Sequence, residues 1–148
     1  MNVYPIEAGN FKLDGGAMFG VVPKSLWTKT NPADADNMIE MSSRCMLVEN
    51  SDKLILVDTG MGDKQSEKFF KYYKRWGSDN LVKSINSAGF SIDDVTDVLL
   101  THLHFDHCGG AVAWDSSKEA YDVLFKNANY WSNDCLLYTS DAADDDHC

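Results

Sequence analysis

The stretch "THLHFDHCGG", residues 101–110, constrains this chain more than any other part of it. Three of the chain's four histidines fall within six positions here, at His102, His104 and His107, and Asp106 lies beside the last of them. The apolar run "DVLL" leads into the cluster, which predicts a short buried strand ending where the histidines begin. The carboxyl end of a buried strand is the usual place for a binding site in an α/β fold.

The spacing of the cluster sets the directions of its side chains. In an extended segment alternate side chains point to the same side, so His102 and His104 are expected to face together. Asp106 and His107 follow at once, and we expect the Gly-Gly pair at 109–110 to permit a sharp change of chain direction. Two imidazoles would then point one way, with a carboxylate and a third imidazole close by.

This cluster predicts a metal site. Three neighbouring imidazoles would repel one another if charged, and each would need a hydrogen-bond partner if buried and neutral. A bound cation removes both difficulties, and imidazole and carboxylate ligands suit Zn²⁺, iron or manganese. The alternative, ordinary surface or core histidines, is usual for one histidine but not for three beside an aspartate. Cys108 adjoins the cluster, and we expect it to be a small packing residue and not a ligand.

Charge and composition limit the classes of molecule that the protein can bind. The formal net charge of −10 disfavours a nucleic-acid partner, because such proteins need a basic face. The start "MNVYPIEAGNFKL" has no signal-peptide features, and no segment has membrane-spanning length, so we expect a cytoplasmic protein with a small-molecule substrate. The four cysteines form no CxxC pair, so no disulfide framework is expected.

Strand signals dominate the first part of the chain. Residues 1–20 predict a short strand, a turn at Gly9-Asn10, a second strand and a glycine-rich loop, and residues 26–37 predict an exposed loop. Two strand-like runs at 38–50 and 53–60 predict a hairpin around Asn50-Ser51-Asp52. The second run is apolar enough to be buried on both faces.

Helix signals follow. Helices are predicted over 63–76 and 79–89, the second ended by Gly89. Ser91 and Asp94 have the separation of a capping box, which predicts one helical turn. Strands alternating with helices indicate an α/β fold in layers.

Two motifs together resemble a known family. "THLHFDHCGG" matches the HxHxDH signature of the metallo-β-lactamase-fold hydrolases, and "LILVDTG" at 54–60 resembles that family's upstream strand motif. Their order and separation also agree, so residues 1–134 resemble the N-terminal half of the family's four-layer αββα sandwich. The texture of "GGAMFGVVPKSLW" and "SSRCMLVEN" is most similar to the branch containing lactonases and organophosphate hydrolases.

The resemblance implies roles for individual residues. His102 and His104 would bind a first metal ion, and Asp106 with His107 a second. Asp58 would accept hydrogen bonds that hold the ligand loop, although from the residues alone it could equally cap a turn. Two such cations lower the pKa of a shared water, which would attack an ester, lactone, amide or phosphoester. Asp106 would orient that water.

The resemblance also implies ligands that residues 1–134 do not contain: a third histidine for the first metal, a bridging aspartate and a last histidine for the second. No histidine lies in that range outside the cluster. We therefore expect the 148-residue chain by itself to lack a complete two-metal site and to be inactive.

The end of the chain has a different texture. The run "CLLYTSDAAD" from Cys135 resembles the conceptual translation of a transposase-type sequencing adapter. We interpret residues 135–148 as a non-native, disordered tail and residues 1–134 as the N-terminal part of the domain. A frayed acidic terminus is the alternative.

A metal-dependent hydrolase of a lactone or other small ester is the leading hypothesis. One alternative is an oxidoreductase of the same fold, in which a single iron ion bound by two histidines and an aspartate oxidises a sulfur substrate. Another is a non-catalytic domain in which the cluster binds metal without turnover.

Overall fold

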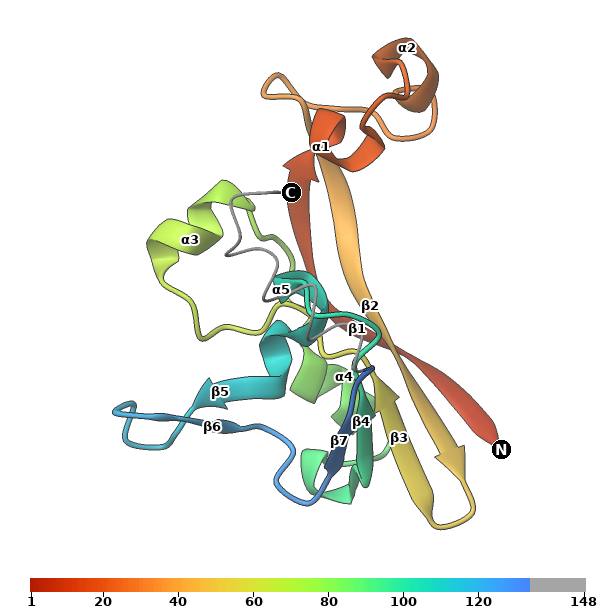
Figure 1. The fold of residues 1–148 in the computed structure, drawn as a ribbon, viewed down its shortest axis with the longest axis vertical. Coiled ribbons are helices and arrows are strands. Elements are labelled where there is room, and N and C mark those ends of the chain that lie inside the picture. Colours follow the sequence, from red (N-terminus) through yellow and green to blue (C-terminus); the bar gives the residue numbers. More distant parts are fainter. Residues whose placement is uncertain (134–148) are drawn as a thin grey trace.

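The computed structural model describes residues 1–133, and strands make up most of its regular structure (Figure 1). Its elements, in chain order, are β1 (Asn2–Asp14), α1 (Gly15–Phe19), α2 (Lys24–Trp27), β2 (Met38–Asn50), β3 (Lys53–Val57), α3 (Glu67–Tyr72), α4 (Leu81–Ser87), η1 (Ile92–Asp94), β4 (Asp97–Leu99), α5 (Phe105–Cys108), η2 (Gly109–Ala111), β5 (Val112–Trp114), β6 (Tyr121–Val123) and β7 (Asn129–Trp131).

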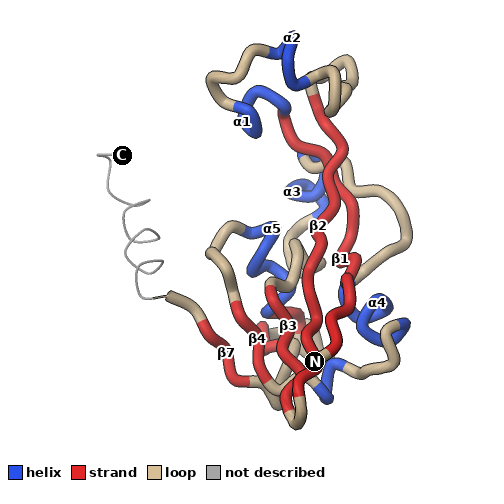
Figure 2. Tube along the Cα trace, turned by 90° about the vertical axis from the view of Figure 1, so that its right-hand side faces the viewer, coloured by secondary structure: helices blue, strands red, loops and turns tan. Residues whose placement is uncertain are grey.

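A five-stranded sheet in the order β1-β2-β3-β4-β7 organises the fold (Figure 2). The first two pairings are antiparallel, and the pairings of β3 with β4 and of β4 with β7 are parallel. A separate hairpin of β5 and β6 projects beside it. The predicted α/β class is confirmed.

The first strand differs from its prediction. The expected turn at Gly9-Asn10 is wrong, because β1 continues through it and pairs with β2 on both sides. The register shifts between Glu7 and Asn10, and Gly9 has a φ of 129°, so the glycine produces a bulge and not a reversal. The outer parts of β1 and β2 extend as an arm that carries α1 and α2 at its tip (Figure 1).

The tip of the arm also differs from its prediction. The expected glycine-rich loop is the short helix α1, whose N-terminus is capped because the Asp14 carboxylate accepts a bond from Ala17 N at 2.9 Å. The segment 26–37 is mostly exposed loop, as expected, but Trp27 is buried and stacks on Phe19 at a centroid distance of 5.1 Å. The aromatic pair gives the tip its own small core.

The predicted hairpin is confirmed, with β2 and β3 joined at residues 50–53. Burial of β3 on both faces is only partly correct, since Leu54 and Leu56 are buried whereas Ile55 and Val57 are half-buried. Ile55 and Val57 point to one face of the sheet, and no described element covers that face fully.

The main core lies between α4 and the other face of the sheet. Its buried side chains are Ile6, Cys45, Leu47, Leu54, Leu56, Leu81, Ile85, Val95, Val98 and Phe125. Both predicted caps are present: Gly89 follows α4 with a φ of 92°, and Ser91 N donates to the Asp94 carboxylate at 2.7 Å. The capped turn η1 ends at Asp94, and β4 begins at Asp97.

Helix α3 is shorter than the predicted span of 63–76. It begins after Ser66, and beyond it the chain pairs with β1, where Lys12 N donates to Tyr73 O at 2.6 Å and Trp76 N donates to Asn10 O at 3.1 Å. The backbone pairing with the edge strand replaces helical hydrogen bonds, and so the helix ends. Over residues 1–133, none of the helices has the length and apolar character needed to cross a membrane.

Candidate metal centre

The site forms where two neighbouring parallel strands end. Val57 and Leu99 are paired in the register of β3 and β4, so the residues that follow both strands meet at one edge of the sheet. Asp58 follows β3 immediately, and its backbone N–H donates to Leu99 O at 2.9 Å. The sheet thus brings the "VDTG" motif next to the histidine motif.

Asp58 is the centre of the hydrogen bonds at this edge. It is buried (8% exposed) and has a φ of 61°, a conformation that aspartate tolerates better than most residues. Its carboxylate accepts bonds from Thr101 N at 2.8 Å, from the Thr101 hydroxyl at 2.8 and 2.9 Å, and from His107 Nδ1 at 2.8 Å. These bonds connect Asp58 to Thr101, which comes directly before the first histidine, and to His107, the last histidine of the cluster.

The three imidazoles are grouped as the spacing predicts. The ring centroids of His102 and His104 are 4.8 Å apart, and those of His102 and His107 are 3.9 Å apart. Asp106 joins them, with Oδ2 3.7 Å from His107 Nε2. All five residues singled out from the sequence therefore lie at one place.

The donor types at this place fit a cation such as Zn²⁺. Because His107 donates Nδ1–H to Asp58, its Nε2 keeps the lone pair that a metal requires, which is the common arrangement for a ligating histidine. Within residues 1–133, however, no group of three or more His, Cys, Asp or Glu side chains is arranged so that it could hold a metal ion. The residues present fit part of a metal site.

The Gly-Gly pair has a different role from the predicted one. Gly109 has ordinary helical angles (φ −59°, ψ −38°), so it is not needed for a sharp turn. Instead a Cβ on Gly109 would lie 2.2 Å from Met61 O, and one on Gly110 would lie 2.2 Å from Thr59 O. The two motifs pack backbone against backbone, which only glycine permits.

Hydrogen bonds lock this backbone contact. Thr59 N donates to His107 O at 2.7 Å, and Gly110 N donates to Gly60 O at 3.0 Å. The Lys64 ammonium, whose pKa is lowered by burial, donates to Gly109 O. The turn that carries His107 is therefore tied to the segment after β3 at several points.

Cys108 behaves as a packing residue. Its thiol donates to Leu103 O at 3.3 Å, and burial raises the pKa of the thiol, which keeps it protonated. Among the described residues Cys45 is the other free cysteine, and burial raises its pKa to about 12.

An aromatic cluster supports the turn from the side of α3. Phe105, between two predicted ligands, meets Phe69 edge-on at 5.5 Å and Tyr73 at 4.7 Å. The sequence pattern gives no indication of these contacts or of a role for Lys64. For Thr101, the only indication of a role in the sequence is its position directly before the first histidine.

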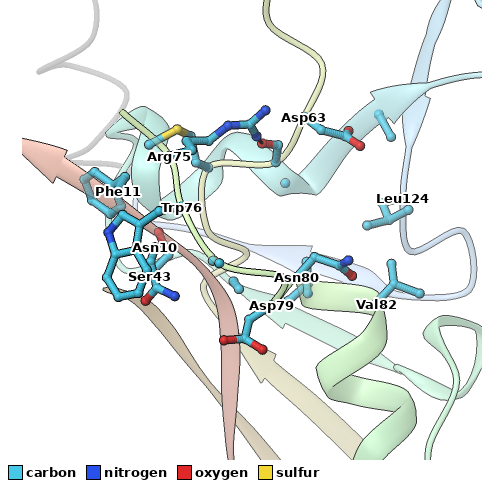
Figure 3. Close-up of a pocket in the computed structure, with 18 of the residues that line it drawn as sticks. Asn10, Phe11, Ser43, Asp63, Arg75, Trp76, Asp79, Asn80, Val82 and Leu124 are labelled. Atoms are coloured by element: carbon cyan, nitrogen blue, oxygen red, sulfur yellow. Dashed lines mark hydrogen bonds between the residues drawn. The ribbon is translucent and has the colours of Figure 1, made fainter. Parts of the chain in front are cut away.

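A cavity of about 470 Å³ lies next to the glycine contact, and Figure 3 shows side chains that line it. Its lining includes Gly62 and Gly110 but none of the predicted site residues. The Arg75 guanidinium lies 3.3 Å from the centroid of the Phe70 ring and donates to Gly62 O at 3.1 Å, so its position is defined. Asp79 and Asn80 lie at the lower side of this space in Figure 3.

The fold and these motifs agree with a family match. The sequence profile described as the metallo-beta-lactamase superfamily matches residues 39–146. The chain belongs to the metallo-beta-lactamase superfamily. This confirms the resemblance found in the sequence. The match extends into residues 135–146, which lie outside the described residues, so the interpretation of 135–148 as a non-native tail stays a prediction.

Proteins with similar sequences include lactonases. An N-acyl homoserine lactonase of Bacillus cereus is 28% identical over 104 residues, which is 64% of this chain and 40% of the lactonase. A probable metallo-hydrolase of Mycobacterium tuberculosis is 31% identical over 108 residues, 64% of this chain and 35% of that protein.

Solved structures give the same family. A probable metal-dependent hydrolase from Staphylococcus aureus superposes with a TM-score of 0.85 at 30% identity, over 95% of this chain and 50% of the hydrolase. AidC, a dizinc quorum-quenching lactonase, superposes with a TM-score of 0.60 at 30% identity, over 86% of this chain and 40% of the lactonase. The chain thus spans half or less of the length of these proteins and corresponds to a partial, N-terminal half of the superfamily fold.

Proposed function

We propose that the intact protein is a metal-dependent hydrolase that opens a lactone or cleaves another small ester. The observation that carries this proposal is the bond from His107 Nδ1 to Asp58, which leaves Nε2 available at the HxHxDH motif of a superfamily that includes lactonases. A small-molecule substrate also agrees with the net charge of −10, which is unfavourable for nucleic acid.

We infer that His102 and His104 would bind a first cation and that Asp106 and His107 would bind a second. Zn²⁺ suits this donor set best, and iron or manganese would also accept it. When bound, such cations acidify a water molecule and polarise the carbonyl that it attacks.

The chain's own residues would orient the attacking water and hold the metal ligands in position. Asp106 would accept a hydrogen bond from the attacking water and so orient it towards the substrate. Asp58 would hold His107 in one orientation. The Gly-Gly contact would keep this turn against the segment after β3, so that the ligands move together.

The first step of the test is to sequence the source DNA through the codons for Asp134 and Cys135. The protein encoded by the recovered reading frame is then assayed. If the frame continues with new histidines and an aspartate, the longer protein should bind zinc and hydrolyse N-acyl homoserine lactones or simple aryl esters. His102→Ala and Asp106→Asn should lower hydrolysis by at least about 100-fold, the size of one positioned catalytic group. Lys29→Ala, on the arm, serves as a control.

Two outcomes would overturn the proposal. Bound iron with oxygen uptake and no hydrolysis would favour the sulfur-oxidising alternative. Bound metal without turnover on any ester, together with unfolding of His102→Ala, would favour a non-catalytic domain.

A further inference from the structure

Thr101 lies between Asp58 and His102, and its hydroxyl contacts both. The hydroxyl oxygen is 2.8 and 2.9 Å from the two carboxylate oxygens of Asp58 and 3.1 Å from His102 Nδ1. We propose that Thr101 is a positioning residue that sets which ring nitrogen of His102 carries the proton.

The number of protons available to Thr101 fixes the direction of its hydrogen bonds. A hydroxyl has one proton to donate, and an ionised carboxylate can only accept. If the Thr101 proton pointed elsewhere, its oxygen would face the Asp58 carboxylate at 2.8 Å with no hydrogen between them, which is repulsive. The proton therefore lies towards Asp58, and the Thr101 oxygen is left to accept from His102 Nδ1–H.

This places both imidazoles in the same tautomer. His107 donates Nδ1–H to Asp58 directly, and His102 donates Nδ1–H to Asp58's partner Thr101. In both rings Nε2 then keeps its lone pair. One carboxylate thus orients two histidines, the second through a hydroxyl. Under the proposed function, on which this consequence rests, those two histidines bind different cations.

The hydroxyl is not needed to place the loop. Thr101 N already donates to Asp58 Oδ1 at 2.8 Å, and every residue except proline can make that bond. The Thr101 residue is exposed, so replacing its hydroxyl by a methyl group changes no core packing. Thr101→Val therefore removes the hydroxyl's bonds to Asp58 and His102, while Thr101 N and His107 Nδ1 still bind one Asp58 oxygen each. Thr101→Ser retains the hydroxyl.

The experiment is ¹⁵N magic-angle-spinning NMR of the histidine-labelled 148-residue chain, at high pH with a chelator present, a method that tolerates self-association. His102, assigned by its loss in His102→Gln, should show protonated Nδ1 in the native chain and in Thr101→Ser. In Thr101→Val it should shift towards protonated Nε2, while His107 remains unchanged. A native His102 with protonated Nε2, or an unchanged His102 in Thr101→Val, would overturn the inference.

A second readout separates this inference from the proposed function. In the intact protein, Thr101→Val should lower zinc affinity by about tenfold, as loss of a partner outside the ligand shell does, and Thr101→Ser should restore it. Equal zinc affinity in the native and Val proteins would count against the relay. Absence of zinc binding in every form would defeat the proposed function and leave the tautomer result standing.

Discussion

The carbonyl oxygen of Thr59 lies 2.2 Å from the position that a Cβ atom on Gly110 would occupy. No side chain fits there without moving the backbone of one motif away from the other. We expect Gly110→Ala to lower the free energy of unfolding by about 3 kcal/mol or more, the upper range for overpacking. Gly16→Ala is the matched control, because its Cβ would meet no backbone atom but only the ends of two side chains, Asp14 Oδ1 at 2.9 Å and Asn37 Nδ2 at 3.7 Å. Equal urea midpoints for the two variants would contradict this account.

Asp58→Asn tests the charge that holds His107. Asparagine tolerates the positive φ of this position, so the change removes charge without adding backbone strain. If the Asn carbonyl oxygen keeps the bond from Thr101 N–H, the amide nitrogen takes the place of Oδ2 and faces His107 Nδ1–H, donor against donor. We expect zinc affinity of the intact protein, measured by competition with a chelator, to fall about 10- to 100-fold. The exposed Asp63→Asn, which removes the same charge, should bind zinc normally.

The edge-to-face pair of Phe69 and Phe105 should be energetically coupled. A double-mutant cycle of both residues to alanine should give a coupling of about 0.5–1.5 kcal/mol in the free energy of unfolding. The cycle of Phe69 with Phe90, which packs with Tyr4 in the other cluster, should be additive. Coupling of similar size in both cycles would show that the effect is not specific to the ring contact.

Asp97 should make stability depend on acid pH. The Lys53 ammonium, followed by the Thr96 hydroxyl and the Trp131 indole N–H, holds the pKa of Asp97 at about 2. Because this lies below the value in the unfolded chain, the stabilisation is complete above about pH 4 and is lost as the pH falls towards 2. The difference in unfolding free energy between native protein and Asp97→Asn should therefore shrink from pH 5 to pH 2. A constant difference would argue against the lowered pKa.

The uncovered face of the sheet should make this chain self-associate. Met46, Leu99 and Trp131 are 42%, 41% and 55% exposed, and β-pairing places them with Val57 in one row. We expect light scattering to show aggregates of the 148-residue chain that Met46→Lys reduces.

The control for this prediction is Val21→Lys at the tip of the arm, where Val21 is fully exposed. If only that change restored a monodisperse chain, the arm and not the sheet would be the associating surface. A monodisperse native chain that retains two metal ions through gel filtration would contradict the prediction more broadly.

Local signals predicted local structure well. The hairpin at residues 50–53, the end of α4 before Gly89 and the capping box at Ser91 follow from turn and cap chemistry, which depends on neighbours in sequence. The errors arose where distant pairing decided the outcome. Gly9 reads as a turn, but continuous pairing with β2 makes it a bulge, and α3 ends early because the chain after it pairs with β1.

By itself, the sequence determined the chemical character of the site, because His102, His104, Asp106 and His107 are close neighbours along the chain and their types and spacing suit a cation. Only the tertiary structure decided what holds them. Asp58 is 49 positions from His107 and reaches it because β3 and β4 pair in parallel. The same pairing makes the absence of a Cβ at Gly110 a requirement, since close backbone approach depends on where two distant segments meet.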